Sequence, residues 1–358
     1  MNKLIKYIGM DVHKAMTVIA VLDAAGTILA QATIQTQAAT LLAFIRGLDG
    51  VLYVTLEEST YSAWLHDLLS PHVAKVVVCD PRRNASYFKS GNKSDQIDAH
   101  KLADLLRCNM LNPVYHGNAS GGTLKELARS YLALVEDLTR VMNRLKALYR
   151  GRGIACGGQR VYSTLSRSPW LEQLREPGVR GRAELLYRQL DALTPLRREA
   201  RKALLVESRR HPAAQSLRSV PGLGPVRVAL LLALMQTPHR FRGKRQLWAY
   251  AGLAIVTWGS GQYCLVEGRI QRSPRRVLIR GLNRNYQHDL KNVFKGAALT
   301  VLGHAGPLQL FYASRVAQGM KPQMALLTLA RKIAVITLTV WKKGGRFDAA
   351  HLKAHQAA

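Results

Sequence analysis

Residues 91–107 have the sequence GNKSDQIDAHKLADLLR, in which two acids, Asp95 and Asp98, open an otherwise apolar, helix-forming run. Residues three apart lie side by side on a helix, so the two carboxylates can converge on one cation. Three cations surround the pair: Lys93, Lys101 and Arg107. This arrangement favours a metal ion held against phosphate. The helix dipole also favours carboxylates in any first helical turn, so an acidic helix start is the alternative.

The residues before this run alternate in the way of an α/β domain. The expected strands cover residues 7–12, 17–22, 28–34, 51–56 and 75–80, and the expected helices cover residues 38–48 and 61–69. Three strands followed by alternating helix and strand is the order of a ribonuclease-H-like domain. The sequence therefore predicts a RuvC-like α/β domain in the N-terminal part of the chain.

Acids stand at the ends of these strands. Asp11 ends the first strand, and Glu57 and Glu58 follow the fourth. Together with Asp95 and Asp98, four carboxylates from separate elements can hold two Mg²⁺ ions about 4 Å apart, the geometry that activates a nucleophile against phosphate. Strand alternation puts Glu57 and Glu58 on opposite faces. We prefer Glu57, which adjoins the last apolar residue of the strand.

The composition indicates a polyanion partner. The 358 residues include 52 Lys and Arg against 22 Asp and Glu, a formal net charge of +30, and the basic residues are expected through the whole length. The four cysteines lie far apart, so neither a zinc site nor a disulfide framework is predicted. The N-terminus has no apolar signal core, which favours a cytoplasmic protein. Arg331 and Lys332 interrupt the apolar residues 324–341, which favours a buried helix over a membrane span.

A heptad pattern begins at Leu124. Two apolar series recur every seven residues: Leu124, Tyr131, Leu138 and Leu145, and beside them Leu127, Leu134, Val141 and Leu148. The pattern predicts a long coiled-coil helix with a basic outer face, for which ordinary solvated charge is the alternative. Residues 151–168 are expected to form a linker or excursion. A second helical segment, residues 182–205, with Pro195 as a candidate restart, is expected to pair antiparallel with the first.

Residues 219–231, SVPGLGPVRVALL, look like a helix-hairpin-helix element. Gly222 and Gly224 allow close backbone approach, and the second helix offers its first amides and Arg227 to a nucleic-acid phosphate. A simple turn between packed helices is the alternative. Residues 240–253 then mix cations with aromatics, as surfaces that bind phosphates and stack bases do, although the aromatics can equally belong to the core. The expected contacts are Arg240, Arg242, Lys244 and Arg245.

Ser260 lies between Gly259 and Gly261, which leave its hydroxyl accessible and let a phosphate approach the chain. A Gly-Ser-Gly run is more often a turn than a nucleophile. Cations able to stabilise a phosphate at this serine follow closely: Arg269, Arg272, Arg275, Arg276 and Arg280. No His or Lys base stands at a fixed spacing, so attack by Ser260 would require a metal ion held by the N-terminal acids.

Five motifs occur in order: IGMDVHK at residues 8–14, LEEST at 56–60, NKSDQIDA at 92–99, VPGLGP at 220–225 and GSG at 259–261. Along essentially the whole chain they resemble the DEDD-type transposases of bacterial insertion sequences, the group that includes pilin-gene invertases and bridge-RNA-guided recombinases. The resemblance implies a RuvC-like catalytic domain over residues 1–117, a coiled-coil dimerisation and linker region over 118–212 and a mostly α-helical transposase domain over 213–358. The positions that match the family's catalytic residues are Asp11, Glu57, Asp95, Asp98 and Ser260.

The resemblance also implies a mechanism and partners. DNA is excised and integrated through a covalent phosphoserine intermediate, in a Mg²⁺-dependent tetramer guided by a structured non-coding RNA. The expected partners are therefore donor and target DNA, the guide RNA and further copies of the chain. The family usually has a Lys-Arg-Gly-Asn-like run after the serine, whereas residues 271–276 are QRSPRR. The alternatives are a Mg²⁺-dependent, structure-specific endonuclease that uses water, and a non-catalytic nucleic-acid scaffold.

Overall fold

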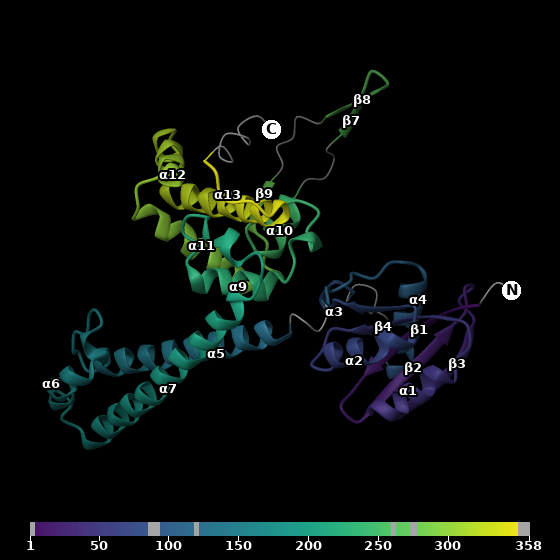
Figure 1. The fold of residues 1–358 in the computed structure, drawn as a ribbon, viewed down its shortest axis with the longest axis horizontal. Helices are drawn as coiled ribbons and strands as arrows, with labels where there is room; N and C mark the ends of the chain where they lie inside the picture. The colour runs from purple at the N-terminus through teal and green to yellow at the C-terminus, as the bar shows by residue number, and fades with distance from the viewer. Residues whose placement is uncertain (1–3, 85–93, 118–121, 259–262, 273–277, 350–358) are drawn as a thin grey trace. The chain divides into compact units, whose positions relative to one another are not determined.

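The computed structural model describes residues 4–84, 94–117, 122–258, 263–272 and 278–349 (Figure 1). The chain divides into two compact units, which we call the sheet unit (Met1–Ala119) and the helical unit (Ser120–Ala358). The predicted further boundary at residue 212 lies inside the helical unit and stays a prediction.

The sheet unit is built on one five-stranded sheet with the strand order β3-β2-β1-β4-β5. The strands are β1 (Ile5–Val12), β2 (Met16–Leu22), β3 (Ile28–Gln35), β4 (Val51–Glu57) and β5 (Lys75–Cys79). β1 pairs antiparallel with β2 and β2 with β3, whereas β4 pairs parallel with β1 and β5 pairs parallel with β4. This mixed α/β sheet agrees with the predicted element order and is consistent with a RuvC-like fold.

Helices cover both faces of the sheet. Side chains from α1 (Ala38–Arg46) and α2 (Ser62–Leu69) share one apolar core with Ile8, Met10 and other residues on one face. A short helix, α3 (Pro81–Asn84), follows β5. On the opposite face, α4 (Asp95–Arg107) packs directly on β1 and β2. Asp95 and Asp98 therefore begin the helix that covers the second face.

Gly9 of β1 determines how closely α4 approaches the sheet. A Cβ atom at Gly9 would lie 2.1 Å from the Ala99 carbonyl oxygen and 2.5 Å from the Ala103 amide nitrogen. Real Cβ atoms do not make such contacts, so only glycine allows the backbones of β1 and α4 to touch at this point.

The helical unit begins with a long antiparallel helix pair. α5 (Gly122–Arg150) and α7 (Pro177–Arg209) are joined through α6 (Arg167–Glu172) and two short 3₁₀ turns, Arg160–Tyr162 and Thr164–Ser166. Heptad residues near the end of α5, such as Leu145 and Leu148, share a core with Leu186 and Leu190 of α7. Part of the predicted heptad pattern is thus buried within one chain. Its further use as a coiled coil between two copies stays a prediction.

α7 departs from the prediction at two points. The helix starts at Pro177 rather than near residue 182, because Pro177 stands at the first helical position, where its missing amide costs nothing. Pro195 lies inside the helix and does not restart it. One proline removes one backbone hydrogen bond, and the buried residues on both sides of it, among them Leu190 and Leu204, keep the long helix continuous against its neighbours.

The rest of the helical unit is a helical core with two β-ribbons. The helices are α8 (Ala214–Arg218), α9 (Pro225–Met235), α10 (Lys244–Tyr250), α11 (His288–Leu302), α12 (Pro307–Ala317) and α13 (Pro322–Lys343). A 3₁₀ turn, Pro238–Arg240, precedes α10. One ribbon pairs β6 (Ile255–Trp258) with β9 (Leu278–Leu282), and the other pairs β7 (Tyr263–Val266) with β8 (Arg269–Arg272). The sequence did not predict these ribbons.

α13 is long and apolar enough to cross a membrane by length and composition, but 67% of its most apolar window is buried inside the protein. Leu329, Ile333 and Trp341 belong to the main core of the helical unit. The predicted buried helix at residues 324–341 therefore agrees with the structure.

Basic residues occur along the whole chain, but the net positive charge is not evenly shared between the two units. Residues 1–119 contain 11 Lys and Arg against 10 Asp and Glu, whereas residues 120–358 contain 41 against 12. The cations of residues 1–119 are nearly balanced by acids, so the two parts differ in net charge although both contain basic residues. Almost the whole excess of charge belongs to the helical unit.

Candidate active site at the edge of the sheet

Asp11 and Glu57 lie at the ends of adjacent parallel strands. In the register of β1 and β4, Gly9 pairs with Thr55 and Met10 with Leu56, so the next position along the strands brings Asp11 beside Glu57. The apolar core on the other face takes Met10 and Leu56. Side chains alternate along a strand, so Asp11 and Glu57 both point to the face that α4 covers.

The first turn of α4 brings the other two acids to this edge. Ser94 caps the helix, accepting a hydrogen bond from the Ile97 amide at 3.3 Å, and thereby fixes where the helix starts. Asp95 and Asp98 follow at once in the first turn. Because α4 lies directly on Gly9, two residues before Asp11, the start of the helix and the end of β1 meet.

His13 lies between two of these acids and was not assigned a role from the sequence. Its Nε2 atom is 3.2 Å from Asp11 Oδ2 and 3.5 Å from Asp95 Oδ2. One ligand atom from each of the three residues lies within 4.8 Å of the others, a spacing that suits a metal ion. The spacing of Asp11 and His13, two residues apart at a strand end, was the available signal.

The electrostatics of the edge favour a cation. Burial raises the pKa of Asp11 above its ordinary value, and the negative charges of Asp95 and Asp98 raise it further, while the ion pair with His13 opposes both. Carboxylates that repel one another in this way are relieved by a divalent ion. Carboxylate oxygens are the ligands that Mg²⁺ prefers, so the donor set fits Mg²⁺.

The second glutamate, Glu58, is engaged elsewhere. Its Oε2 atom lies 2.7 Å from His116 Nε2, and the His116 ring stacks on His66 with centroids 5.2 Å apart. Glu57 instead pairs in register with Cys79 of β5, whose thiol pKa is raised to about 12, mainly by burial. These contacts favour Glu57 over Glu58 as the acid that faces α4, and its role as a metal ligand stays a prediction.

The predicted nucleophile and several cations cannot be placed. Ser260, Arg275 and Arg276 lie outside the described residues. Arg272 is described only as the last residue of β8, and Arg269 is exposed at the start of that strand. The predicted contacts of these residues with nucleic acid remain predictions.

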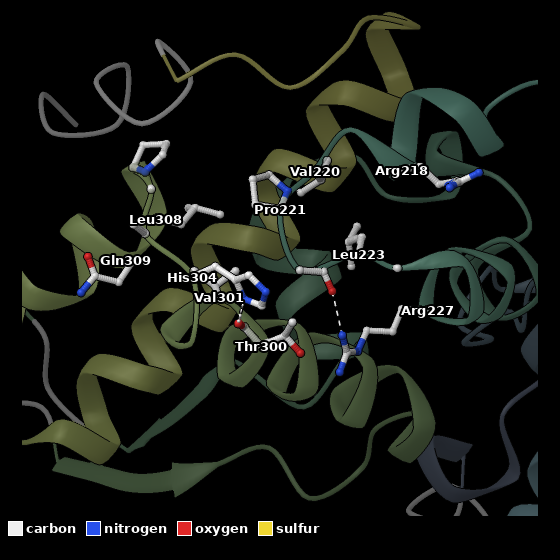
Figure 2. Close-up of a pocket in the computed structure, with 15 residues that line it drawn as sticks. Arg218, Val220, Pro221, Leu223, Arg227, Thr300, Val301, His304, Leu308 and Gln309 are labelled. Atoms are coloured by element: carbon white, nitrogen blue, oxygen red, sulfur yellow. Dashed lines mark hydrogen bonds between the residues drawn. The ribbon is translucent and has the colours of Figure 1, made fainter.

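The predicted hairpin borders a cavity of about 450 Å³ between the loop before α9 and the loop between α11 and α12 (Figure 2). Gly222 has φ +84° and packs on α11, where a Cβ would lie 2.5 Å from the Ala297 carbonyl oxygen. Gly224 caps α9. Arg227 folds back and donates from Nη1 to the Gly222 carbonyl oxygen at 2.9 Å. Arg227 therefore braces its own loop, and the phosphate contact predicted for this element stays a prediction.

The basic segment before the ribbons is partly core. The Arg240 guanidinium stacks over the rings of Phe241 at 5.2 Å and Tyr250 at 4.5 Å. Trp248 donates from its indole nitrogen to the Arg331 carbonyl oxygen at 3.1 Å. These aromatic side chains thus take part in the packing of the unit, as the alternative to a base-stacking surface had it. Arg242 and Arg245 are exposed and Lys244 is half-buried.

Two family models match the chain. The model of DEDD transposases of IS110 matches residues 8–151, which include all four predicted acids, and the model described as the transposase IS116/IS110/IS902 family matches residues 214–295. The uncharacterized 44.8 kDa protein of insertion element IS116 from Streptomyces clavuligerus is 25% identical and covers 91% of this chain and 92% of its own length. The transposase for insertion sequence element IS1111A from Coxiella burnetii is 24% identical over 58% of each chain.

The two matches follow one another in the chain and describe the same kind of protein. The first spans the sheet unit, including Asp11, Glu57, Asp95 and Asp98, which we call the acid edge. The second spans the hairpin and the ribbons of the helical unit. The chain therefore belongs to the IS110/IS116 family of insertion-sequence transposases.

Proposed function

We propose that the protein cuts and rejoins DNA through a covalent phosphoserine intermediate at Ser260, with Mg²⁺ held by Asp11, Glu57, Asp95 and Asp98. The observation that supports the metal site most strongly is the arrangement of the edge: β1 and β4 point two acids to one face, and α4 starts with two more acids against that face. Membership of a transposase family supports DNA as the substrate.

The residues of the edge would hold the ion through carboxylate oxygens. When bound, Mg²⁺ polarises the phosphodiester and lowers the cost of deprotonating the attacking hydroxyl. Glu58, tied to His116, would hold the end of β4 in place while Glu57 faces α4. The Gly9 contact would keep the two pairs of acids at a fixed separation.

The proposed chemistry at Ser260 balances without a co-reactant. The Oγ atom attacks the scissile phosphorus, a bond between phosphorus and a sugar oxygen breaks, and the released DNA end keeps a free hydroxyl. Such a hydroxyl from another DNA end then attacks the phosphoserine and releases the serine. The energy of the phosphodiester is conserved, so strands can be joined without ATP.

The proposal extends to the partners. A structured guide RNA would choose donor and target DNA by base pairing, and copies of the chain would assemble as a dimer through the α5 and α7 region and as a tetramer on DNA. The strong positive charge of the helical unit supports binding to nucleic acid of either kind.

The decisive experiment traps the intermediate. Wild-type protein is incubated with donor DNA, guide RNA and Mg²⁺, denatured, and examined for a protein–DNA adduct by gel shift and mass spectrometry. We expect an adduct on the peptide that contains Ser260, none with Ser260→Ala, and a normal amount with the control Ser273→Ala. An undiminished adduct with Ser260→Ala would refute the assignment.

A second candidate is a structure-specific endonuclease that hydrolyses DNA with water. The acid edge alone favours it, because four carboxylates around Mg²⁺ suffice for hydrolysis. The two candidates differ in one product: hydrolysis gives cleaved DNA without any adduct and without rejoined strands. Cleavage by Ser260→Ala at the wild-type rate would favour the endonuclease.

A further inference from the structure

The β6/β9 ribbon leaves the helical core with little side-chain packing to hold it. Three apolar residues from its two strands, Ile255, Leu278 and Ile279, are 45%, 67% and 66% exposed. A two-stranded ribbon without a covered apolar face is only marginally stable in water. The direction of this ribbon therefore depends on the contacts at its base, where β6 begins at Ile255 and β9 ends at Leu282.

Asn283, the residue after β9, closes this base. Its backbone amide donates to the carbonyl oxygen of Ala254, directly before β6, at 3.0 Å. Its side-chain Nδ2 donates to the Ala249 carbonyl oxygen of α10 at 3.0 Å and to the Asn285 carbonyl oxygen at 2.8 Å. Its Oδ1 accepts a hydrogen bond from the Asn285 amide at 3.1 Å. One residue thus joins α10, the start of β6 and the end of β9.

The turn between α10 and β6 is held from two further sides. Arg331 of α13 donates from Nε to the Leu253 carbonyl oxygen at 2.6 Å. Gly252 has φ +64°, and a Cβ atom there would lie 2.4 Å from the ring of Tyr286, so this ring fills the space that only glycine leaves open. The turn is therefore fixed by α13 and by the segment after β9, and Asn283 ties the ribbon to it.

Asn283 does more than an ordinary turn residue. Asparagine in a turn commonly bonds the backbone two residues on, as Asn283 does with Asn285. The bond from Nδ2 to Ala249 is different, because it crosses to another element of the fold. The side chain of Asn285 is exposed and forms no hydrogen bond within the described part of the chain. The bond to α10 therefore distinguishes two asparagines of one turn.

We infer that Asn283 is a positioning residue: its bond to α10 fixes the direction in which the β6/β9 ribbon leaves the core, and so orients the strand that leads to Ser260. The inference rests on the proposed function, because Ser260, which lies outside the described residues, follows the end of β6 by two positions in the sequence. A displacement of about 1 Å at a reacting group can lower a rate about a hundredfold. A side chain at the base of the ribbon can thus control the rate without touching DNA.

The test separates the rate from the affinity. Formation of the protein–DNA adduct in a single turnover, at saturating donor DNA with guide RNA and Mg²⁺, is measured for full-length wild type, Asn283→Ala and Asn283→Asp. At neutral pH, aspartate keeps the shape of asparagine and the acceptor for the Asn285 amide, but it cannot donate to the Ala249 carbonyl oxygen. The matched control is Asn285→Ala in the same turn. DNA affinity is measured for each protein by fluorescence anisotropy.

We expect both Asn283 variants to form the adduct about ten to a hundred times more slowly than Asn285→Ala, with a DNA affinity within about twofold of wild type. A rate equal to that of the control in either variant would overturn the inference. So would a fall in rate matched by an equal fall in DNA affinity, which is the result expected of a merely structural residue. Asn283→Asp is nearly isosteric, so it keeps the test valid if Asn283→Ala fails to fold.

A second measurement does not involve the serine. Hydrogen exchange followed by mass spectrometry reports on the backbone hydrogen bonds between β6 and β9. We expect exchange in these two strands to be about twofold to tenfold faster in both Asn283 variants than in Asn285→Ala, with α11 unchanged. Exchange equal to that of the control would overturn the inference.

The outcome is separable from that of the proposed function. Faster exchange and slower DNA cleavage in the Asn283 variants, with no adduct even in wild type, would refute the serine chemistry and keep the positioning role. Unchanged exchange and an unchanged adduct rate in these variants, with a Ser260-dependent adduct in wild type, would refute the positioning role and keep the chemistry.

Discussion

The sheet unit and the helical unit carry opposite kinds of charge arrangement. The sheet unit is nearly neutral, yet it gathers acids at one edge, whereas the helical unit holds almost all of the excess positive charge. A single net charge of +30 hides this division. The difference teaches that the same chain presents one surface suited to a metal ion and another suited to a polyanion, and each can be tested without disturbing the other.

The largest effect should come from the acids of the edge. Asp11→Asn or Asp95→Asn removes a charged ligand, so we expect DNA rejoining to fall by about a hundredfold or more and Mg²⁺ affinity by at least about tenfold. Isothermal titration with Mg²⁺ and a strand-exchange assay measure the two quantities. Asp104→Asn on the same helix, which loses only its ion pair with Arg107, is the matched control. Equal Mg²⁺ binding by all three variants would disprove the metal site.

The contact of Gly9 with α4 predicts the next largest effect. Gly9→Ala places a Cβ against the backbone of α4, so we expect the free energy of unfolding to fall by about 3 kcal/mol or more. In the helical unit, a Cβ at Gly181 meets nothing within 4 Å, and Gly181→Ala inside α7 should instead stabilise by about 0.5 to 1 kcal/mol. Urea denaturation gives both values. The same sign for both substitutions would contradict this contrast.

The two adjacent glutamates predict a smaller difference. Glu57→Gln should lower Mg²⁺ affinity about tenfold, because the residue faces α4 with Asp11. Glu58→Gln removes a charge that pairs with His116, so its Mg²⁺ affinity should change less than about twofold. The pair is compared by the same titration. A stronger effect at Glu58 would reverse the assignment.

The smallest effect concerns pH. Asp11 has a raised pKa, so its charged form is less favourable in the folded protein than in the unfolded chain. The metal-free protein should therefore lose stability as pH rises from about 4 through the pKa of Asp11, and Asp11→Asn should remove that part of the dependence. Thermal melts of both proteins between pH 4 and pH 7 in a chelator measure the difference. Saturating Mg²⁺ should reverse the slope of the wild type.

Much of the sheet unit follows from local sequence. Period-two apolar residues predict β1 and β4, an acid at the end of each strand predicts the edge, and the opening of α4 predicts the other pair. His13 was not predicted as a member of the site, because its imidazole suggests a metal ligand only once Asp95, more than eighty residues later in the sequence, is known to lie beside it. The orientation of Glu57 could be argued from alternation, and register was needed to place it beside Asp11.

The helical unit was harder to predict because its contacts are long-range. Pro195 suggested a break, yet packing on both sides of it keeps α7 continuous. The nucleic-acid contacts predicted for Arg227 and Arg240 stay predictions, and no local pattern foretold that Arg227 donates to its own loop or that Arg240 stacks on aromatic rings.

The backbone contact at Gly9 limits the distance between β1 and α4. The separation of Asp11 from Asp95 is limited where the two main chains touch, a contact made by backbone atoms and not by apolar side chains. A change in the spacing between Asp11 and the first turn of α4 would therefore have to shift the backbone at Gly9 as well.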